Sequence, residues 1–267
     1  MQYGSYRGAP GTSNTNRYPS PAIFSALDAL AERPGRTVGI FDDFETFPKT
    51  WGTTEGNWGR YKTFGSSGSA SSDGDAVGGV MTLTEATDNE SMALMTGATP
   101  FQIINTGGLL GFEARIKVSS IADTSHGLIV GLADARTLIV GDPLDTSSVL
   151  ISTLNFVGWQ KLETDGDRMN FTFQENGETQ VVVEEDAATL VADTFIKVGF
   201  LFDPAKKLLT HFVDGLASST TKTVSDTAGD AFPNDVRLGM VLARMSGAST
   251  PGTQSIDWWK CVQHIPA

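Results

Sequence analysis

Residues 168–184 read Arg-Met-Asn-Phe-Thr-Phe-Gln-Glu-Asn-Gly-Glu-Thr-Gln-Val-Val-Val-Glu, and this stretch decides the fold class. A methionine and two phenylalanines alternate with polar residues in its first half, which places them on one face of a strand. Asn176-Gly177 is a turn pair, and residues 179–184 supply a second strand rich in valine. The stretch predicts an antiparallel β-hairpin with one apolar face.

The same two-residue period recurs on both sides of this hairpin. Residues 112–118 place Phe, Ala, Ile and Val on one face and charged residues on the other. Residues 196–202 and 208–213 form a second hairpin, and Asp214-Gly215 starts the next turn. Further strands are expected at 79–84, 91–95, 127–133, 149–153, 236–243 and 256–262. A series of about ten to twelve such strands indicates two antiparallel sheets packed face to face.

The composition agrees with an all-β domain. The chain has 267 residues, of which 40% are hydrophobic, and its 29 glycines favour many turns between short strands. The Gly- and Ser-rich stretch 65–75 resembles a linker, but residues 41–61 before it are too few for a domain, so we interpret it as a loop. We predict a single two-sheet antiparallel jelly-roll sandwich over residues 38–267.

Residues 1–37 differ from the rest and are predicted to be a flexible, extended arm with one short helix. The first 20 residues are polar and turn-prone, with too little apolar surface to fold alone. Residues 20–32 predict the helix, because Ser20 can cap it and Pro21 suits its first turn. Its apolar face can pack on the sandwich or on another chain. The residues expected to serve assembly are Tyr3, Tyr6, Arg7, Arg17, Tyr18, Ile23, Phe24, Leu27 and Leu30.

The net charge and the lack of visible targeting signals limit the kinds of molecule that the chain is expected to bind and the places where it is expected to reside. The formal net charge of -12 disfavours nucleic acid as a partner. Cys261 stands alone, which excludes an intrachain disulfide. We see no apolar core of a signal peptide and no run of about 18 apolar residues that could span a bilayer. The chain is expected to be soluble.

Several segments together resemble the concanavalin-A-like lectin/glucanase superfamily, which includes laminin-G-like modules. They are residues 112–118 followed by 127–132, the hairpin that leads to 211–215, the last strand 256–260 and the opening 41–45. The resemblance covers roughly residues 38–263 and implies a jelly-roll sandwich. Two functions found in that superfamily, glycan binding and glycan cleavage, follow as alternatives.

The residues needed for cleavage are not complete in the sequence. Glucanases of this superfamily carry Glu-x-Asp-x-x-Glu on one strand, because a retaining mechanism needs two carboxylates about 5 Å apart. The nearest match is 184–189, where Thr189 stands in place of the second glutamate, and Glu184 and Asp186 are interpreted as a solvated strand end. No compact set of lyase residues is visible either. We therefore predict that the chain is not an enzyme, with glycoside hydrolase or polysaccharide lyase kept as the second alternative.

No cofactor is predicted. His126, His211 and His264 lie far apart and show no metal-ligand spacing. Calcium is the one ion that the oxygen-rich loops 73–75, 142–145 and 165–167 could hold, although each also fits an ordinary turn.

Aromatic side chains mark a candidate glycan site. Rings that stack on sugars are expected at Trp51, Trp58, Tyr61 and Trp259. Since Trp258 and Trp259 are adjacent on a strand, they must face opposite sides. One of them is expected in the core, and the other is expected to be exposed or covered by the arm or a neighbouring molecule.

The polar arm ahead of a lectin-like sandwich is similar in style to structural proteins of tailed bacteriophages. This resemblance implies a virion protein of the capsid-decoration or head-fibre type, located on the capsid surface. Its partners would be capsid protein or other virion subunits, further copies of itself, such as a trimer, and a host-surface glycan. A glycan-binding lectin-like module is the first alternative.

Overall fold

The structure is a computed structural model. It describes residues 17–31, 36–45, 56–58, 60–65, 68–72, 79–85, 87–104, 106–135, 142–224, 231–234, 236–247 and 252–266.

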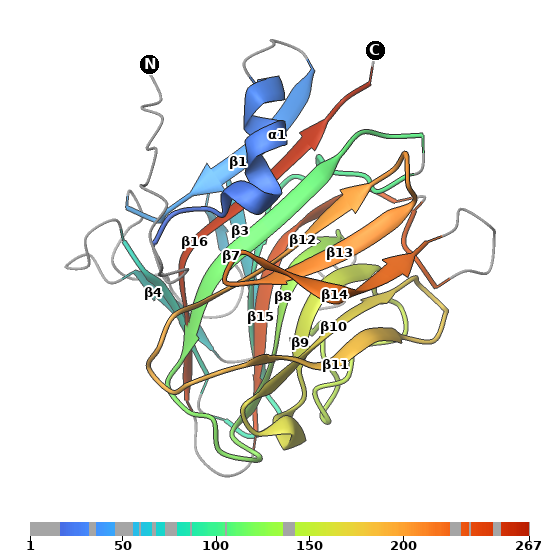
Figure 1. Cartoon of the computed structure of the whole chain (residues 1–267). Helices are drawn as coiled ribbons and strands as arrows, with labels where there is room; N and C mark the ends of the chain where they lie inside the picture. The colour runs from blue at the N-terminus through green and yellow to red at the C-terminus, as the bar shows by residue number, and fades with distance from the viewer. Residues whose placement is uncertain are drawn as a thin grey trace.

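Two antiparallel sheets, each of eight strands among the described residues, stack face to face in a jelly-roll sandwich, as predicted (Figure 1). Sheet A consists of β1 (Thr37–Asp42), β4 (Ser69–Ser72), β5 (Met81–Thr84), β7 (Leu110–Val118), β12 (Ile196–Asp203), β13 (Leu208–Val213), β14 (Leu216–Thr223) and β16 (Thr253–His264). Sheet B consists of β2 (Gly56–Trp58), β3 (Tyr61–Gly65), β6 (Ser91–Thr96), β8 (His126–Asp134), β9 (Phe156–Lys161), β10 (Arg168–Gln174), β11 (Val181–Thr189) and β15 (Leu238–Ser246). A 3₁₀ turn, Glu163–Asp165, follows β9.

The main core lies between the sheets and is filled from alternate positions of the strands. Phe112 on β7 and Phe171 on β10 both pack against Phe200 on β12, with ring centroids 5.5 Å and 5.9 Å from that of Phe200. Trp159 and Trp259 are fully buried in the same cluster. A core shared by both sheets is what makes the two layers one sandwich.

The predicted hairpins are confirmed. The hairpin of residues 168–184 is β10 with β11, and the next is β12 with β13. Asp214 and Gly215 join β13 to β14 with φ angles of 48° and 77°. Two positive φ angles are required by the type I′ turn that suits the twist of a tight hairpin, and glycine adopts them without strain.

Two local predictions were wrong. Residues 149–153 are not a strand: Leu150 forms an isolated bridge with Leu144, and both pack on the outer face of sheet B. Apolar residues in this loop are buried without pairing to a strand. Sequence periodicity cannot distinguish such a buried loop from a strand. The Gly- and Ser-rich stretch contains β4, whose Ala70 enters the main core.

Candidate functional site

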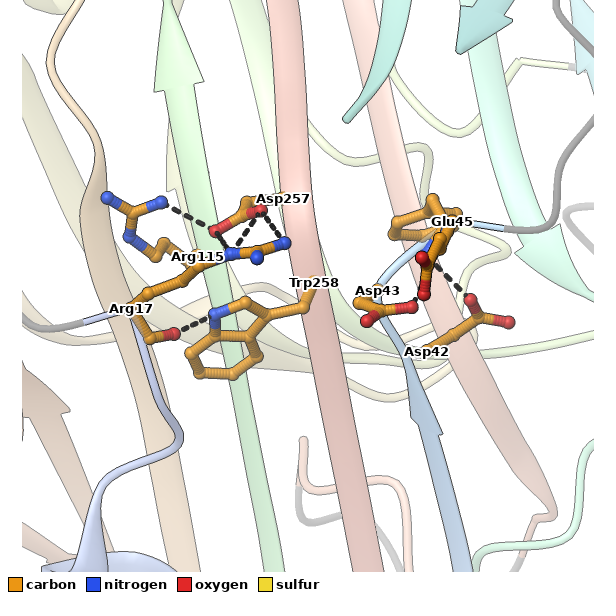
Figure 2. A network of polar contacts seen from close by, with 8 residues as sticks. Arg17, Asp42, Asp43, Glu45, Arg115, Asp257 and Trp258 are labelled. Carbon is orange, nitrogen blue, oxygen red and sulfur yellow. Dashed lines mark hydrogen bonds and ion pairs between the residues drawn. The ribbon is translucent and has the colours of Figure 1, made fainter. Parts of the chain in front are cut away.

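The outer face of sheet A carries the chain segment that precedes the sandwich. Residues 17–20, called the clasp from here on, and α1 (Pro21–Ala31) both lie on this face. Figure 1 shows α1 crossing in front of sheet A, and Figure 2 shows Arg17 beside β16. The clasp fixes the path of the chain as it enters the domain.

Asp257 on β16 is the centre of the clasp. Arg17 donates from Nη2 and Nε to its carboxylate at 2.8 Å and 3.0 Å. Arg115 on β7 donates from Nη1 to the other carboxylate oxygen at 2.5 Å. The Asp257 side chain is 3% exposed, so two guanidinium groups compensate one buried carboxylate. Figure 2 shows the carboxylate between the two arginines.

Trp258 forms the second contact of the clasp. Its indole Nε1–H donates to the backbone carbonyl of Arg17, and Phe41 on β1 packs against its ring at 6.3 Å. The side chain is therefore buried although it points away from the main core. The expectation that one tryptophan of the pair is covered by the arm is confirmed for Trp258.

Ser20 makes the third contact and begins α1. Its N–H and Oγ–H donate to the two oxygens of Glu113 at 2.7 Å and 2.5 Å, and Lys197 Nζ donates to Ser20 Oγ at 3.2 Å. Burial raises the pKa of Glu113, and the bonds from Ser20 and the charge of Lys197 oppose that rise. The Ser20 side chain thus binds the sheet, while its backbone carbonyl accepts the first helical bonds from Ile23 and Phe24.

Helix α1 docks with its apolar side on sheet A. Ile23, Phe24 and Leu27 are buried against β7, β12 and β16, with Phe212 and Val262 in the same cluster. Gly111 permits this approach, since a Cβ there would lie 2.8 Å from both Ile23 Cγ2 and Leu27 Cδ1. The helix is therefore packed on its own domain.

This packing corrects several assembly residues. The prediction that Ile23, Phe24 and Leu27 anchor the chain to a partner was wrong, because their side chains fill the interface with sheet A. Leu30 is half-buried, and Arg17 is bound by Asp257. Tyr18 is 52% exposed and remains accessible. Tyr3, Tyr6 and Arg7 lie outside the described residues.

The predicted glycan site is corrected as well. Tyr61 and Trp259 are fully buried, with ring centroids 5.6 Å apart, so neither can stack on a sugar. Trp259 Nε1–H donates to the Tyr61 hydroxyl, which donates to Asp42. Desolvation raises the pKa of Tyr61. Trp51 and the side chain of Trp58 lie outside the described residues.

Amide side chains occupy the outer face of sheet B instead. Gln160 and Gln174 are buried and donate to backbone carbonyls of Ser148 and Ile151, which holds loop 142–155 on that face. Asn170 and Gln180 are half-buried beside them. This part of the face offers partly accessible hydrogen-bonding groups next to a covered apolar patch.

Glu184 and His211 form a link between the two sheets. Glu184 on β11 lies 2.7 Å from His211 Nε2 on β13, and Ser218 on β14 donates to the same carboxylate at 2.6 Å. Glu184 is not at a strand end, since it lies within β11 (Val181–Thr189), and its 32% exposed side chain is bound by Ser218 and His211; Asp186 is exposed, as predicted. Because Ser218 donates to the carboxylate and not to the imidazole, the three groups lack the order of a Ser-His-Glu nucleophile system.

The other sequence-based expectations concern metals and membranes. Among the described residues, no group of three or more His, Cys, Asp or Glu side chains is placed to hold a metal ion. Residues 73–75 lie outside that part of the chain, and the absence of a cofactor, with calcium as the one ion considered, stays a prediction. No helix within the described ranges is long and apolar enough to cross a membrane.

Sequence reasoning missed most of the clasp. The charged positions of β7 were predicted to face solvent, yet Glu113 is fully buried under Ser20. The available signal was the outward triplet Glu113, Arg115 and Lys117 beside an apolar helix at residues 21–31. Nothing in the spacing indicated that Asp257, 240 residues away, would accept from Arg17.

No protein-family model matches the chain, and no curated protein matches its sequence. Solved structures do match its fold. Peanut lectin is 15% identical with a TM-score of 0.59, and the match covers 87% of this chain and 100% of the lectin. An endo-1,3-β-glucanase from Streptomyces sioyaensis is 15% identical with a TM-score of 0.55, covering 88% of this chain and 99% of the enzyme.

A third structure is arcelin-5, a lectin-like defence protein from Phaseolus vulgaris. It is 11% identical with a TM-score of 0.53, and the match covers 87% of this chain and all of arcelin-5. At these identities the likeness shows the fold, a lectin/glucanase β-sandwich. The same fold carries both binding proteins and an enzyme, so fold alone does not assign an activity.

Proposed function

We propose that this chain is a non-enzymatic structural protein of a virion, of the capsid-decoration or head-fibre type, which displays a lectin-like sandwich. The clasp is the observation that carries the proposal. Residues 1–16 are polar and contain Tyr3, Tyr6 and Arg7, groups suited to binding another protein surface. They join the domain at the clasp, where Arg17 binds Asp257, Trp258 donates to the Arg17 carbonyl and Ser20 donates to Glu113.

The clasp explains how an attached arm could carry a domain without unfolding it. Force applied through residues 1–16 would reach Arg17 first, and the buried Asp257 carboxylate and Trp258 indole would resist it. Helix α1 follows the clasp, so its apolar contacts are protected from the same force. An arm that is held by the clasp where it enters the domain is suited to attaching the domain to another protein.

The non-enzymatic part of the proposal has separate support. Hydrolysis by this fold needs two carboxylates facing each other across a sugar. The outer face of sheet B carries the amides of Gln160, Asn170 and Gln174, and Glu184 is engaged by Ser218 and His211. These side chains hold loop 142–155 and link the two sheets, which supports a role without catalysis.

The test compares the full chain with a variant in which residues 2–16 are replaced by a Gly/Ser segment of equal length. Molar mass is measured by light scattering, and binding by co-sedimentation with virus-like capsid shells. We expect the full chain to form a defined oligomer or to bind the shells, and the variant to be a folded monomer that does neither. Identical inert monomers would contradict the proposal.

Glycan binding is the second candidate, and the half-buried amides of Asn170 and Gln180 favour it. Amide groups can donate to and accept from sugar hydroxyls at once. A glycan array probed with the full chain and with Asn170→Ala tests this, with Glu178→Ala on the same hairpin as the control. Binding that both variants keep, or that the full chain lacks, would exclude this face as the site.

A further inference from the structure

One end of the sandwich interior is polar. The inner positions of β8 run Leu132, Val130, Leu128 and then His126, and those of β15 run Leu242, Arg244 and Ser246. On the opposite sheet, Gln254 of β16 lies two positions before the core residue Ile256 and therefore faces the same interior. His126, Arg244, Ser246 and Gln254 are all fully buried.

These side chains converge around Gly252. His126 and Ser246 are cross-strand partners, and Arg244 lies two residues along the same face. Arg244 Nη1 donates to the carbonyl of Gly252, and a Cβ on Gly252 would lie 3.6 Å from His126 Nδ1. Gly252 therefore sits between the imidazole and the guanidinium, two residues before Gln254.

Several polar atoms in this cluster have no hydrogen-bond partner within the described ranges. They are His126 Nε2, Arg244 Nε and Nη2, Ser246 Oγ, and both amide atoms of Gln254. Leaving a buried donor unsatisfied costs about 1–3 kcal/mol, and more for a charged group. The described chain supplies no acceptor for these clustered donors, so an acceptor from outside the chain would satisfy them.

The charges around the cluster are mainly positive at its centre. Burial lowers the pKa of Arg244 to about 10 and that of Lys161 to about 8, so both remain cationic near neutral pH. His126 is neutral there, since burial and these two cations lower its pKa to about 3. Glu85 acts on Arg244, while Asp123, Glu163, Asp165 and Asp167 act on Lys161. Within the part of the chain that the structure describes, the charges that act on His126 are those of Lys161 and Arg244.

We propose that this cluster is a binding site for one small planar monovalent oxyanion, of the formate or nitrate class. Arg244 Nε and Nη2 form one edge of the guanidinium, whose two parallel N–H groups match two oxygens of a planar anion. His126 Nδ1 lies 3.0 Å from Ser125 Oγ; with that hydroxyl donating, the imidazole proton is on Nε2, which then donates to the anion. Ser246 Oγ–H and the Gln254 amide complete the donor set from both sheets.

The test uses the full chain dialysed free of carboxylates and nitrate. Thermal unfolding is followed while sodium formate or nitrate replaces chloride at constant ionic strength. Above the dissociation constant, each tenfold increase in a ligand that binds only the folded state raises Tm by roughly 3 °C for a domain of this size. Equilibrium dialysis with labelled formate is expected to show one equivalent retained per chain.

Two variants identify the site. Arg244→Lys keeps the charge but loses the planar edge, and Gln254→Leu removes the amide contributed by the opposite sheet. Both are expected to weaken formate retention at least tenfold, whereas Arg60→Lys, at a position with a 62% exposed side chain, retains it. If Arg244→Lys does not fold, Gln254→Leu decides.

Three results would overturn the proposal. They are the absence of retained formate, retention that is equal in Gln254→Leu and the full chain, and a Tm shift that chloride produces equally well. Retention lost in the two site variants but kept in Arg60→Lys supports it.

Discussion

His126 shows at the scale of one residue how burial couples stability to pH. Its pKa falls from 6.5 to about 3 in the folded chain because burial and the charges of Lys161 and Arg244 disfavour the imidazolium. The unfolded chain therefore takes up a proton near pH 6.5 that the folded chain refuses. The stability associated with this histidine is complete above that pH and is lost progressively as the pH falls toward 3.

We predict that wild type loses about 2–3 kcal/mol of stability between pH 7.5 and pH 4.5 through this residue alone. A His126→Gln variant cannot take up the proton, so its stability should vary less with pH by that amount. Urea unfolding at the two pH values measures the difference, in buffers free of carboxylates. Parallel pH profiles for the two proteins would contradict the assignment.

Asp257 is the second residue with a measurable effect. Changing Asp257 to Asn leaves Arg17 and Arg115 without their shared carboxylate and should destabilise the chain by about 1–3 kcal/mol. This value is below the roughly 3–5 kcal/mol expected for breaking a fully buried ion pair, because the Arg17 side chain is 33% exposed and water screens its charge. A double-mutant cycle with Arg17→Met in urea isolates their coupling.

The control for this cycle is Asp28→Asn, which breaks the surface pair between Asp28 and Lys260. It should change stability by less than about 1 kcal/mol. Zero coupling between Arg17 and Asp257 would mean that this ion pair contributes nothing to the stability of the fold.

Helix α1 shows the same kind of dependence at the scale of an element. Eleven residues make a marginal helix in water, so its stability must come from the surface that it covers. Gly111 lies under Ile23 and Leu27, and a larger side chain there would raise the helix off the sheet. The absence of a side chain at Gly111 on β7 is therefore required for α1 to pack on sheet A.

Gly111→Val should lower stability by about 1–3 kcal/mol and should expose α1 to proteases. Limited proteolysis, read by mass spectrometry for cuts within residues 17–36, measures this. Gly39→Val is the matched control, since a Cβ at Gly39 would meet its nearest atom at an ordinary 3.5 Å. Equal protection of α1 in both variants would show that glycine is not required at position 111.

The elements themselves were largely predictable from the sequence. Met169, Phe171 and Phe173 alternate cleanly with Asn170, Thr172 and Gln174, because polar side chains still mark the outer face of β10 although Thr172 and Gln174 are buried there. Strand β9 was missed because Phe156, Gly158 and Gln160 face loop 142–155 and not water, which removes the polar half of the alternation. Periodicity reports the alternation of apolar and polar residues, and it fails where apolar residues or glycines occupy both faces of a strand.

The whole molecule depends on residues that precede its first strand. Sheet A is covered on its outer face only after Ile23, Phe24 and Leu27 are in place, so residues 17–31 belong to the folded unit. A truncation at residue 37 would expose that apolar face as well as remove the arm. Such a variant mixes two effects in one measurement.

We therefore predict that a chain lacking residues 2–36 aggregates or unfolds several degrees below one lacking only residues 2–16. Light scattering and thermal unfolding of the two proteins measure this. If both melt alike and stay monodisperse, α1 is dispensable to the sandwich.

The candidate sites could not be predicted to the same degree at this scale. Tyr61 and Trp259 were chosen as aromatic rings suited to sugars, but they meet in the core across 198 residues of sequence. Arg17 was expected to bind another molecule. It binds Asp257 of its own chain, which lies so far along the sequence that no local pattern indicates the pairing. Long-range contacts decide which polar and aromatic groups remain accessible, and no local pattern carries that information.

Strand β16 determines when this protein can become folded during synthesis. Residues 253–264 pair with β7 along one edge and with both β1 and β5 along the other. Strand β1 therefore cannot pair until β16 has been synthesised. Sheet A stays incomplete on the ribosome until the more than 200 residues between these strands have emerged. Such separated pairings fold slowly and leave strand edges free to associate meanwhile, so the yield of folded protein should depend on chaperones more than its final stability suggests.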